Sequence, residues 1–160
     1  MPDEIYLFTD GSVNPQSRIG FGASLVVEDL EMPPDEAKDQ VQLKIFEDTS
    51  STKLELQILL DTLAKLEKYK KKVIVYTDSQ NIVGLFGRRL RLEKNKYIAK
   101  NGRLINNHEL YQEFYRITNL LNCQIIKVKG HKSSSLKNKI DFFFTLVDRA
   151  ARNGLRMHKD

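Results

Sequence analysis

The stretch VIVYTDSQ, residues 73–80, decides how this chain is interpreted, because a run of strand-forming residues ends abruptly in an aspartate. The segment YLFTDGS, residues 6–12, repeats the arrangement of apolar residues, then Thr-Asp, then a small residue. In open α/β sheets, ligands gather beyond the carboxyl ends of the strands. The two segments therefore place Asp10 and Asp78 at a sheet edge where a binding site is expected.

Each of these aspartates also has a plain structural explanation. Asp10-Gly11 is a common turn pair, and Asp78 is suited to cap the helix that follows it. For either residue alone this explanation is the stronger one. The matching contexts of the two residues make the pair more informative than either residue singly.

The segments around these aspartates predict a mixed α/β sheet. Strand-forming residues occur at 5–9, 20–28 and 41–47, and the last of these segments alternates between apolar and polar side chains. The sequence MPPD at residues 32–35 predicts a turn that joins the second and third strands in an antiparallel hairpin.

From residue 53 the apolar period changes from that of a strand to that of a helix. The leucines at positions 56, 59, 60, 63 and 66 fall on one helical face. A crossover helix here makes the buried strand at 73–76 parallel to its sheet neighbour. Further elements are expected as a short helix from about Ser79, a helix at 107–121, a strand at 124–129 and a helix at 139–156. The order βββαβαβα describes an α/β fold with a mixed five-stranded sheet and helices on both faces.

The composition is that of a soluble globular protein, and we expect one domain over residues 1–160. The chain is 41% hydrophobic and 29% charged, whereas disordered chains contain far fewer apolar residues. The opening residues, MPDEIYLF, lack the features of a signal peptide, and no apolar run reaches the length of a membrane span. We therefore expect a cytoplasmic protein. Its single cysteine, Cys123, agrees with a reducing compartment and is expected to serve in packing.

The basic residues are concentrated in two segments. Residues 88–103 contain seven Lys or Arg and one acid, a net charge of +6, and residues 127–139 contain five Lys, a net charge of +5. The other residues contain fourteen basic and twenty acidic side chains, a net charge of −6. Two basic segments on an acidic body suggest a polyanionic partner such as nucleic acid, although lysine-rich loops are more often simply solvated.

Three further acids fall on predicted helices. Glu55 fits a capping box that begins at Thr52, and this box would place Glu55 in the first turn of the crossover helix. Asp141 and Asp148 are seven residues apart and so share one helical face, where local salt bridges are the simplest explanation. Carboxylates from separate elements that cluster need neutralising, and Mg²⁺ is a suitable ion because it takes oxygen ligands.

Five motifs in order along the chain resemble type 1 ribonuclease H. The motifs are FTDGS (8–12), LELQILLDTL (54–63), YTDSQ (76–80), KGHK (129–132) and VDRAAR (147–152). The resemblance covers nearly the whole chain. It implies the ribonuclease H fold, which has the element order described above.

The resemblance also implies an activity and a catalytic site. The family cleaves the RNA strand of an RNA–DNA hybrid with little sequence specificity, leaving 5′-phosphate and 3′-hydroxyl ends. It implies that Asp10, Glu55, Asp78 and Asp148 hold two Mg²⁺ or Mn²⁺ ions for a two-metal mechanism. His131 matches the family's mobile histidine, which is thought to shuttle protons or help release product. We expect the enzyme to act as a monomer.

Substrate contacts are expected from residues near these acids and in the basic segments. The family senses the 2′-hydroxyls of one strand, and lysines and arginines hold phosphates without reading sequence. The expected substrate-binding residues are Gly11, Ser12, Ser51, Thr52, Gln80, Asn81, Arg88, Arg89 and Lys132.

The sequence departs from the family pattern in three places. Thr49-Ser50-Ser51-Thr52 replaces an Asn-rich turn, and the basic segment at 86–106 is short and lacks tryptophan, which predicts hybrid binding with less stacking. The interval from His131 to the last acid is long, and Asp141 lies closer to the usual spacing than Asp148 does. We favour Asp148, because VDRAAR resembles the closing motif of the family, whereas Asp141 is followed by three aromatic residues.

Two other functions compete with the endonuclease interpretation. The first is a non-catalytic module that binds a hybrid or duplex and uses the acids only as caps. The second is a proofreading-type exonuclease, in which the first strand usually has two acids one residue apart. The sequence TDGS lacks that second acid, and the presence of all four carboxylates favours the endonuclease.

Overall fold

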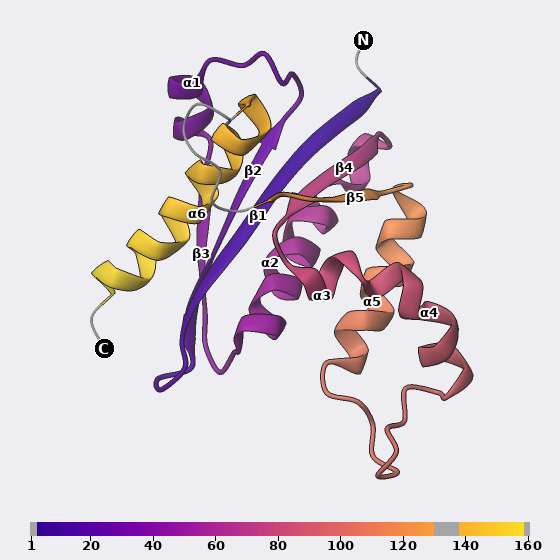
Figure 1. The fold of residues 1–160 in the computed structure, drawn as a ribbon. Helices are drawn as coiled ribbons and strands as arrows, with labels where there is room; N and C mark the ends of the chain where they lie inside the picture. The colour runs from indigo at the N-terminus through magenta and orange to yellow at the C-terminus, as the bar shows by residue number, and fades with distance from the viewer. Residues whose placement is uncertain (1–2, 130–137, 159–160) are drawn as a thin grey trace.

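The computed structural model describes residues 3–129 and 138–158, and its centre is a five-stranded sheet (Figure 1). The strands lie in the order β3-β2-β1-β4-β5. Their bounds are Glu4–Asn14 for β1, Ile19–Val27 for β2, Gln42–Phe46 for β3, Lys72–Thr77 for β4 and Gln124–Lys127 for β5. Strands β1–β2 and β2–β3 pair antiparallel, whereas β1–β4 and β4–β5 pair parallel. The predicted mixed sheet, its hairpin and its parallel crossover are confirmed.

The predicted helices are also present, together with two that the sequence analysis did not anticipate. The helices are α1 at Pro34–Asp39, α2 at Ser51–Leu66 with a 3₁₀ turn η1 at Glu67–Tyr69, α3 at Gln80–Val83, α4 at Leu85–Lys94, α5 at His108–Leu120 and α6 at Lys139–Met157. The expectation of a simple turn at residues 32–35 is wrong, because the proline at N1 begins the short helix α1 there.

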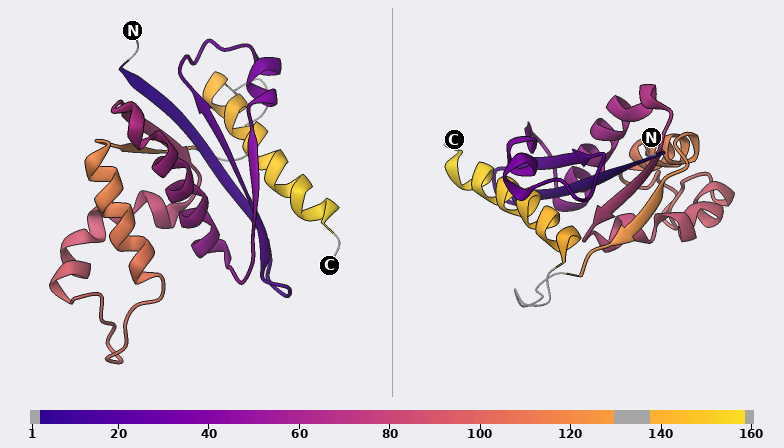
Figure 2. Two further views of the ribbon diagram at one scale, coloured as in Figure 1. Left: turned by 180° about the vertical axis from the view of Figure 1, so that it is seen from behind. Right: turned by 90° about the horizontal axis from the view of Figure 1, so that it is seen from above.

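Helices cover both faces of the sheet, as predicted (Figure 2). Side chains of β1 alternate between the faces: Ile5 and Leu7 pack in one core with α2 and α5, and Phe8 packs in the other core with α6. Cys123 packs against the core on the α2 side, where burial raises the pKa of its thiol to about 12. Its predicted packing role is confirmed.

Strand β1 is longer than the sequence suggested, and this length changes the position of Asp10. The expected strand ended at Thr9, but β1 stays paired with β2 as far as Asn14 opposite Ile19. Pairing with β4 ends earlier, at Phe8 opposite Tyr76. Asp10 therefore lies inside β1, just beyond the parallel pairing, and the explanation of Asp10-Gly11 as a turn is wrong.

Two glycines allow α2 to lie close against the sheet. A Cβ atom at Gly11 would lie 2.9 Å from Leu54 Cδ2, and one at Gly22 would lie 2.7 Å from Ile58 Cβ. Such contacts are too short for larger residues without a shift of the helix. The close approach also fixes the position of Glu55, which follows Leu54 in α2.

The basic segment forms helix α4 followed by a hairpin-like excursion that projects away from the sheet (Figure 1). Ile98 and Leu104 form an isolated antiparallel bridge near its base. The Tyr115 hydroxyl donates a hydrogen bond of 2.6 Å to the Leu85 carbonyl, and Arg89 lies over the Tyr115 ring. This segment was expected only as a charged stretch; its helical part is attached to α5.

A helix that crosses a membrane must be both long and apolar. Within residues 3–129 and 138–158, no helix is both long and apolar enough to cross a bilayer.

Candidate active site

Asp10 and Asp148 meet on the α6 face of the sheet. Asp10 has the same parity in β1 as Phe8, whose side chain packs against α6, and Asp148 lies in the middle of that helix. Burial, followed by the charge of Asp78 and a hydrogen bond with Asp148, raises the pKa of Asp10 to about 8. In the free protein, Asp10 is therefore suited to donate a proton in a hydrogen bond to Asp148 at neutral pH.

Asp78 follows β4 directly, and it does not cap the next helix. Ser79 is the N-cap of α3, since its hydroxyl accepts the Ile82 N–H at 3.2 Å. The explanation of Asp78 as a cap is therefore wrong. Although Asp78 is exposed as a residue, partial burial of its carboxyl group and the charge of Asp148 raise its pKa, while nearby Arg152 and Lys127 lower it. No residue separates the end of the central strand from Asp78, so the strand fixes where this carboxylate begins.

Glu55 reaches the same region from the opposite face of the sheet. The expected capping box is wrong, because α2 begins at Ser51 and its N-cap is Ser50, whose hydroxyl accepts the Lys53 N–H at 3.3 Å. Burial raises the pKa of Glu55, and so does the charge of Asp78, while hydrogen bonds from Ser79 and Ser51 lower it. Because Ser79 bonds both Glu55 and the start of α3, it links the two carboxylate-bearing segments.

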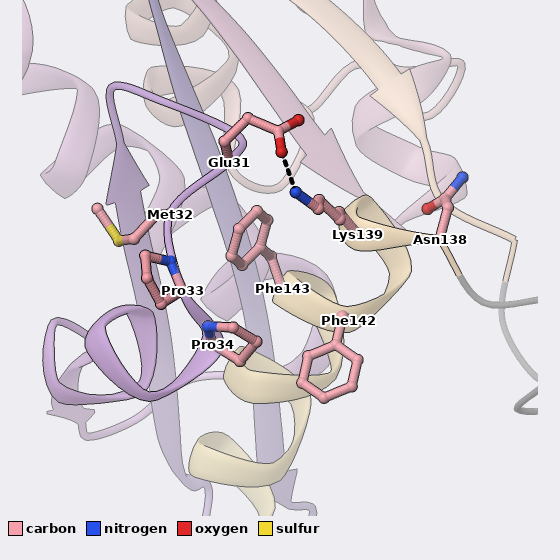
Figure 3. Close-up of a pocket in the computed structure, with 8 residues that line it drawn as sticks. All are labelled: Glu31, Met32, Pro33, Pro34, Asn138, Lys139, Phe142 and Phe143. Carbon is pink, nitrogen blue, oxygen red and sulfur yellow. Dashed lines mark hydrogen bonds and ion pairs between the residues drawn. The ribbon is translucent and has the colours of Figure 1, made fainter.

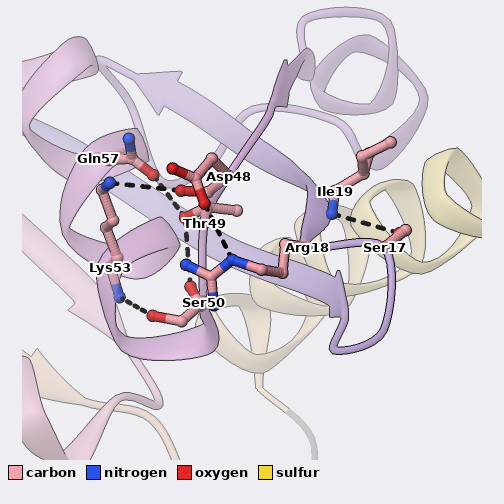
Figure 4. A network of polar contacts seen from close by, with 8 residues as sticks. All are labelled: Ser17, Arg18, Ile19, Asp48, Thr49, Ser50, Lys53 and Gln57. Atoms are coloured by element: carbon pink, nitrogen blue, oxygen red, sulfur yellow. Dashed lines mark hydrogen bonds and ion pairs between the residues drawn. The ribbon is translucent and has the colours of Figure 1, made fainter.

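A network of polar contacts fixes the first turn of α2 (Figure 4). Arg18 Nε pairs with Asp48 Oδ1 at 2.9 Å, and the Thr49 hydroxyl donates to Gln57 Oε1 at 2.7 Å. Lys53 Nζ also donates to the Asp48 carbonyl at 3.3 Å. The segment that replaces the Asn-rich turn of the family is therefore used to hold the start of the helix that carries Glu55. The hydroxyls of Ser51 and Thr52, predicted to bind substrate, lie in exposed positions of this turn.

Asp141 and Asp148 lie in different parts of α6. Asp141 is 7% exposed and forms a capping box with Asn138: its N–H donates to Asn138 Oδ1 at 3.0 Å, and its carboxylate accepts the Asn138 N–H at 3.2 Å. Asp148 lies two turns further along, beside Asp10. The structure thus brings Asp148 to the other carboxylates and uses Asp141 to begin the helix.

The chemistry of the donor set fits a hard divalent cation. Asp10, Glu55, Asp78 and Asp148 provide only oxygen ligands, and the charge of Asp148 is partly balanced by Arg152 Nε at 3.0 Å. Among residues 3–129 and 138–158, no group of three or more acidic, His or Cys side chains is placed closely enough to hold a metal ion. The oxygen donors themselves suit Mg²⁺, which binds through few protein carboxylates and uses water and substrate phosphates for the rest of its shell.

The other predicted substrate-binding residues differ in their surroundings. Gln80 accepts a hydrogen bond from Lys127, and Arg88 donates to Asn81 Oδ1 at 2.7 Å while lying over the Tyr111 ring. Arg89 pairs with Glu93 at 2.8 Å within α4. Gly11 and Ser12 lie within β1, and His131 and Lys132 lie outside the described residues. The sequence analysis did not single out Lys127 or Arg152, although both are basic residues in or beside the KGHK and VDRAAR motifs.

None of the four carboxylates lines either of two cavities in the described part of the chain. One of about 480 Å³ lies between residues 31–34 and the first turn of α6, where Lys139 pairs with Glu31 (Figure 3). Its other lining residues are Met32, Pro33, Pro34, Asn138, Phe142 and Phe143. A polar cavity of about 690 Å³ separates the first turn of α2 from residues 99–107. This cavity lies between α2 and residues 95–107, which we call the basic projection. Its position makes it the better candidate for contact with a substrate backbone.

The chain is similar to known proteins both in sequence and in fold. The RNase H family model matches residues 2–156. A ribonuclease H of Caldicellulosiruptor saccharolyticus is 31% identical over 143 residues, which cover 86% of this chain and 91% of that relative. Similar solved folds include LC9-RNase H1, described as a type 1 RNase H with the type 2 active-site motif, at a TM-score of 0.65 and 20% identity, covering 94% of this chain and 72% of that one. LC11-RNase H1 in complex with an RNA/DNA hybrid matches at a TM-score of 0.59 and 15% identity, covering 94% and 99% of the two chains. The resemblance seen in the motifs is confirmed, and the chain belongs to the RNase H family of nucleases.

Proposed function

We propose that this protein is a metal-dependent endonuclease that hydrolyses the RNA strand of RNA–DNA hybrids with little sequence preference. The observation that carries the proposal is the convergence of carboxylates from β1, α2, the end of β4 and α6, three of which have raised pKa values. Support also comes from the relative named ribonuclease H and from the solved neighbour that holds an RNA/DNA hybrid.

The four carboxylates would hold two divalent cations, Mg²⁺ or Mn²⁺. When bound, such ions supply Lewis acidity and an activated water for in-line displacement, which would leave 5′-phosphate and 3′-hydroxyl ends. In this chain, Asp10 would lose its proton when cations bind, and Asp148 would exchange its hydrogen bond with Asp10 for an ionic contact. Burial first, and the neighbouring carboxylates second, raise the pKa values of Asp10 and Asp78, and a bound cation would offset both effects by stabilising the ionised carboxylates.

The rigid supports of these carboxylates are important for the chemistry. Asp10 lies within β1, which stays paired with β2 beyond this residue. Asp78 directly follows the last residue of the central strand β4. Glu55 is fixed by the network at the start of α2 and by Ser79. Such a preorganised site needs little rearrangement when the scissile phosphate arrives.

The hybrid would lie across the carboxylates with one strand directed toward the basic projection. The polar cavity between Ser50, Thr52 and residues 99–107, which include Asn101 and Arg103, has donors suited to backbone phosphates. Backbone groups of Gly11 and Ser12 and the side chain of Gln80 would face 2′-hydroxyls and base edges in the shallow minor groove. Binding through phosphates predicts weak sequence preference and strong dependence on salt.

Parts of this proposal concern residues beyond those described. The roles of His131 in proton transfer or product release and of Lys132 in phosphate binding stay predictions from the motif KGHK. We also propose that residues 1–160 act as one domain and as a monomer. The cytoplasmic location stays a prediction.

A cleavage assay on a labelled RNA–DNA hybrid, with Mg²⁺, Mn²⁺ or EDTA, tests the proposal. We expect cutting of the RNA strand with either metal and none with EDTA. Hybrid binding without cutting under every metal condition would instead support a non-catalytic binding module. Asp141→Asn and Asp148→Asn form a matched pair on one helix, and a dead Asp141→Asn beside an active Asp148→Asn would contradict the assignment of the fourth carboxylate.

A further inference from the structure

Lys127 lies beside the proposed site and contacts a residue predicted to touch the substrate. It is the last residue of β5 and is paired in register with Thr77, one residue before Asp78. Its Nζ donates a hydrogen bond of 2.6 Å to Oε1 of Gln80, the first residue of α3. The contact joins residues 47 positions apart in the chain, so only the parallel pairing of β4 with β5 creates it.

The chemistry of lysine fixes which way the Gln80 amide points. An ammonium group has three donors and no acceptor, so the amide atom next to it must be the carbonyl oxygen. The bond is charge-assisted, which makes it stronger than a bond between neutral groups. The NH₂ group of Gln80 is therefore the part left for other partners.

This orientation limits what Gln80 is able to recognise. In the minor groove every base pair offers acceptors at purine N3 and pyrimidine O2, and a 2′-hydroxyl is an acceptor as well. The guanine amino group is the one donor on a base edge there, and only an amide oxygen would recognise it. A glutamine whose oxygen is held by the ammonium group, and which presents its NH₂ donors to the groove, therefore treats all base pairs alike.

We propose that Lys127 is a positioning residue that keeps cleavage indifferent to base sequence, by turning the carbonyl oxygen of Gln80 away from the hybrid. This inference rests on the proposed function, because it assumes that Gln80 faces the minor groove. A purely structural role for Lys127, as a counter-charge for Asp78, predicts no change in base preference when Lys127 is replaced. The two roles are therefore separable by experiment.

The first test uses the free protein and does not depend on hydrolysis. The side-chain amide signals of Gln80, identified by their loss in Gln80→Ala, are followed by NMR in wild type, Lys127→Met and Lys127→Arg. We expect Lys127→Met to move the two amide proton signals of Gln80 toward the chemical shifts of a free glutamine side chain. Lys127→Arg should keep both signals close to their wild-type positions. Lys72→Met, at the opposite end of β4, removes the same charge and should leave the signals in place. Unchanged signals in Lys127→Met would overturn the proposal.

The second test maps cleavage sites on a hybrid of randomised sequence. Wild type and Lys127→Arg should cut with a flat base distribution, since both residues only donate. Lys127→Met releases the Gln80 oxygen, and we expect about fivefold enrichment of guanine at one position near the cut, the factor of a single net hydrogen bond. Replacing that guanine by inosine, which lacks the amino group, should abolish the enrichment. A flat distribution in Lys127→Met, or enrichment that persists with inosine, would refute the role.

The two tests also separate failure of this inference from failure of the proposed function. If wild type cuts no hybrid, the proposed function fails, while the NMR comparison still decides whether Lys127 orients Gln80. If wild type cuts hybrid and Lys127→Met keeps a flat distribution, only the role of Lys127 fails.

Discussion

The carboxylate site and the basic projection are built on supports of different kinds. Asp10, Asp78 and Asp148 lie on or directly beside β1, β4 and α6, which are held by strand pairing and by a buried core. The projection at residues 95–107 extends from α4 and α5, and its short bridge joins Ile98 to Leu104. This difference suggests a division of roles: the sheet fixes the positions of reacting groups, and the projection adds binding energy. Each prediction below tests one side of this comparison.

The largest expected effect is on the sheet side. Asp10→Asn should lower the single-turnover rate of hybrid cleavage by about 10³-fold or more, because it removes a proposed cation ligand, and such ligands support several kcal/mol of transition-state stabilisation. Asp141→Asn is the matched control, and its rate should stay within about threefold of wild type, because an Asn at this cap position keeps the acceptor. Measurable Asp10→Asn activity near the wild-type rate would place the chemistry elsewhere.

The second effect is a change in stability with pH at the same residue. The pKa of Asp10 is raised to about 8 in the folded protein, well above its unfolded value near 3.8. The folded state therefore holds the proton more tightly, and this contribution to stability is present at low pH and is lost as pH rises from about 4 through 8. In EDTA, Asp10→Asn should be more stable than wild type at pH 8.5 by roughly 2 kcal/mol, less than the full value of the shift because water screens a half-buried group.

Thermal unfolding at a series of pH values measures this difference. The advantage of Asp10→Asn should shrink to nothing at pH 4, where the folded protein holds Asp10 in its neutral form. Adding Mg²⁺ should stabilise wild type more than the variant, since ligand binding stabilises the folded state. If wild type were instead the more stable protein at pH 8.5 in EDTA, the conclusion that ionised Asp10 destabilises the folded state would be wrong.

The third effect concerns the projection and should appear in binding. Replacing Lys96, Lys100 and Arg103 together by alanine should raise KM for a hybrid about tenfold, with kcat changed by less than about twofold, because phosphate contacts contribute uniform binding. The slope of log KM against log salt concentration should fall by about two to three, as expected when that many phosphate contacts are lost. A large fall in kcat with constant KM would show that the projection takes part in chemistry.

The smallest effect should arise where the projection joins the body. Arg88 donates to Asn81 and lies over the Tyr111 ring, so Arg88→Ala should lower the free energy of unfolding by about 1 kcal/mol. Arg91→Ala, on an exposed position of the same helix, should change it by less than about 0.5 kcal/mol. Denaturant titration measures both, and equal values for the two variants would mean that Arg88 serves mainly in substrate contact.

Several features of the fold could be predicted because their signals are local. The apolar run 73–76 predicted the central strand β4, and the leucine period after residue 53 predicted α2. The motifs around Asp10, Asp78 and Asp148 named residues that the structure places near one another. Side-chain periodicity and short motifs are properties of neighbouring residues, so the sequence contains them directly.

Other expectations failed where two local solutions compete. The sequence analysis offered Asp78 as a cap for α3 and Thr52 as the start of a capping box for α2, whereas the structure uses Ser79 and Ser50. The length of β1 was also underestimated, because DGSVN is typical of a turn until β2 pairs with it. Helix α4 was not predicted, because it is held on α5 by a hydrogen bond from the hydroxyl of Tyr115, which lies 30 residues from its partner Leu85.

The sequence by itself therefore determined the order of the strands, the family and the four carboxylates proposed to hold cations. Only the tertiary structure decided that Asp78 does not cap α3, that Asp10 lies within a strand, and that Lys127 contacts Gln80. The physical reason is that these outcomes depend on pairing and burial between residues distant in the chain. Local propensities differ by about 1 kcal/mol or less between competing caps, so long-range contacts select among them.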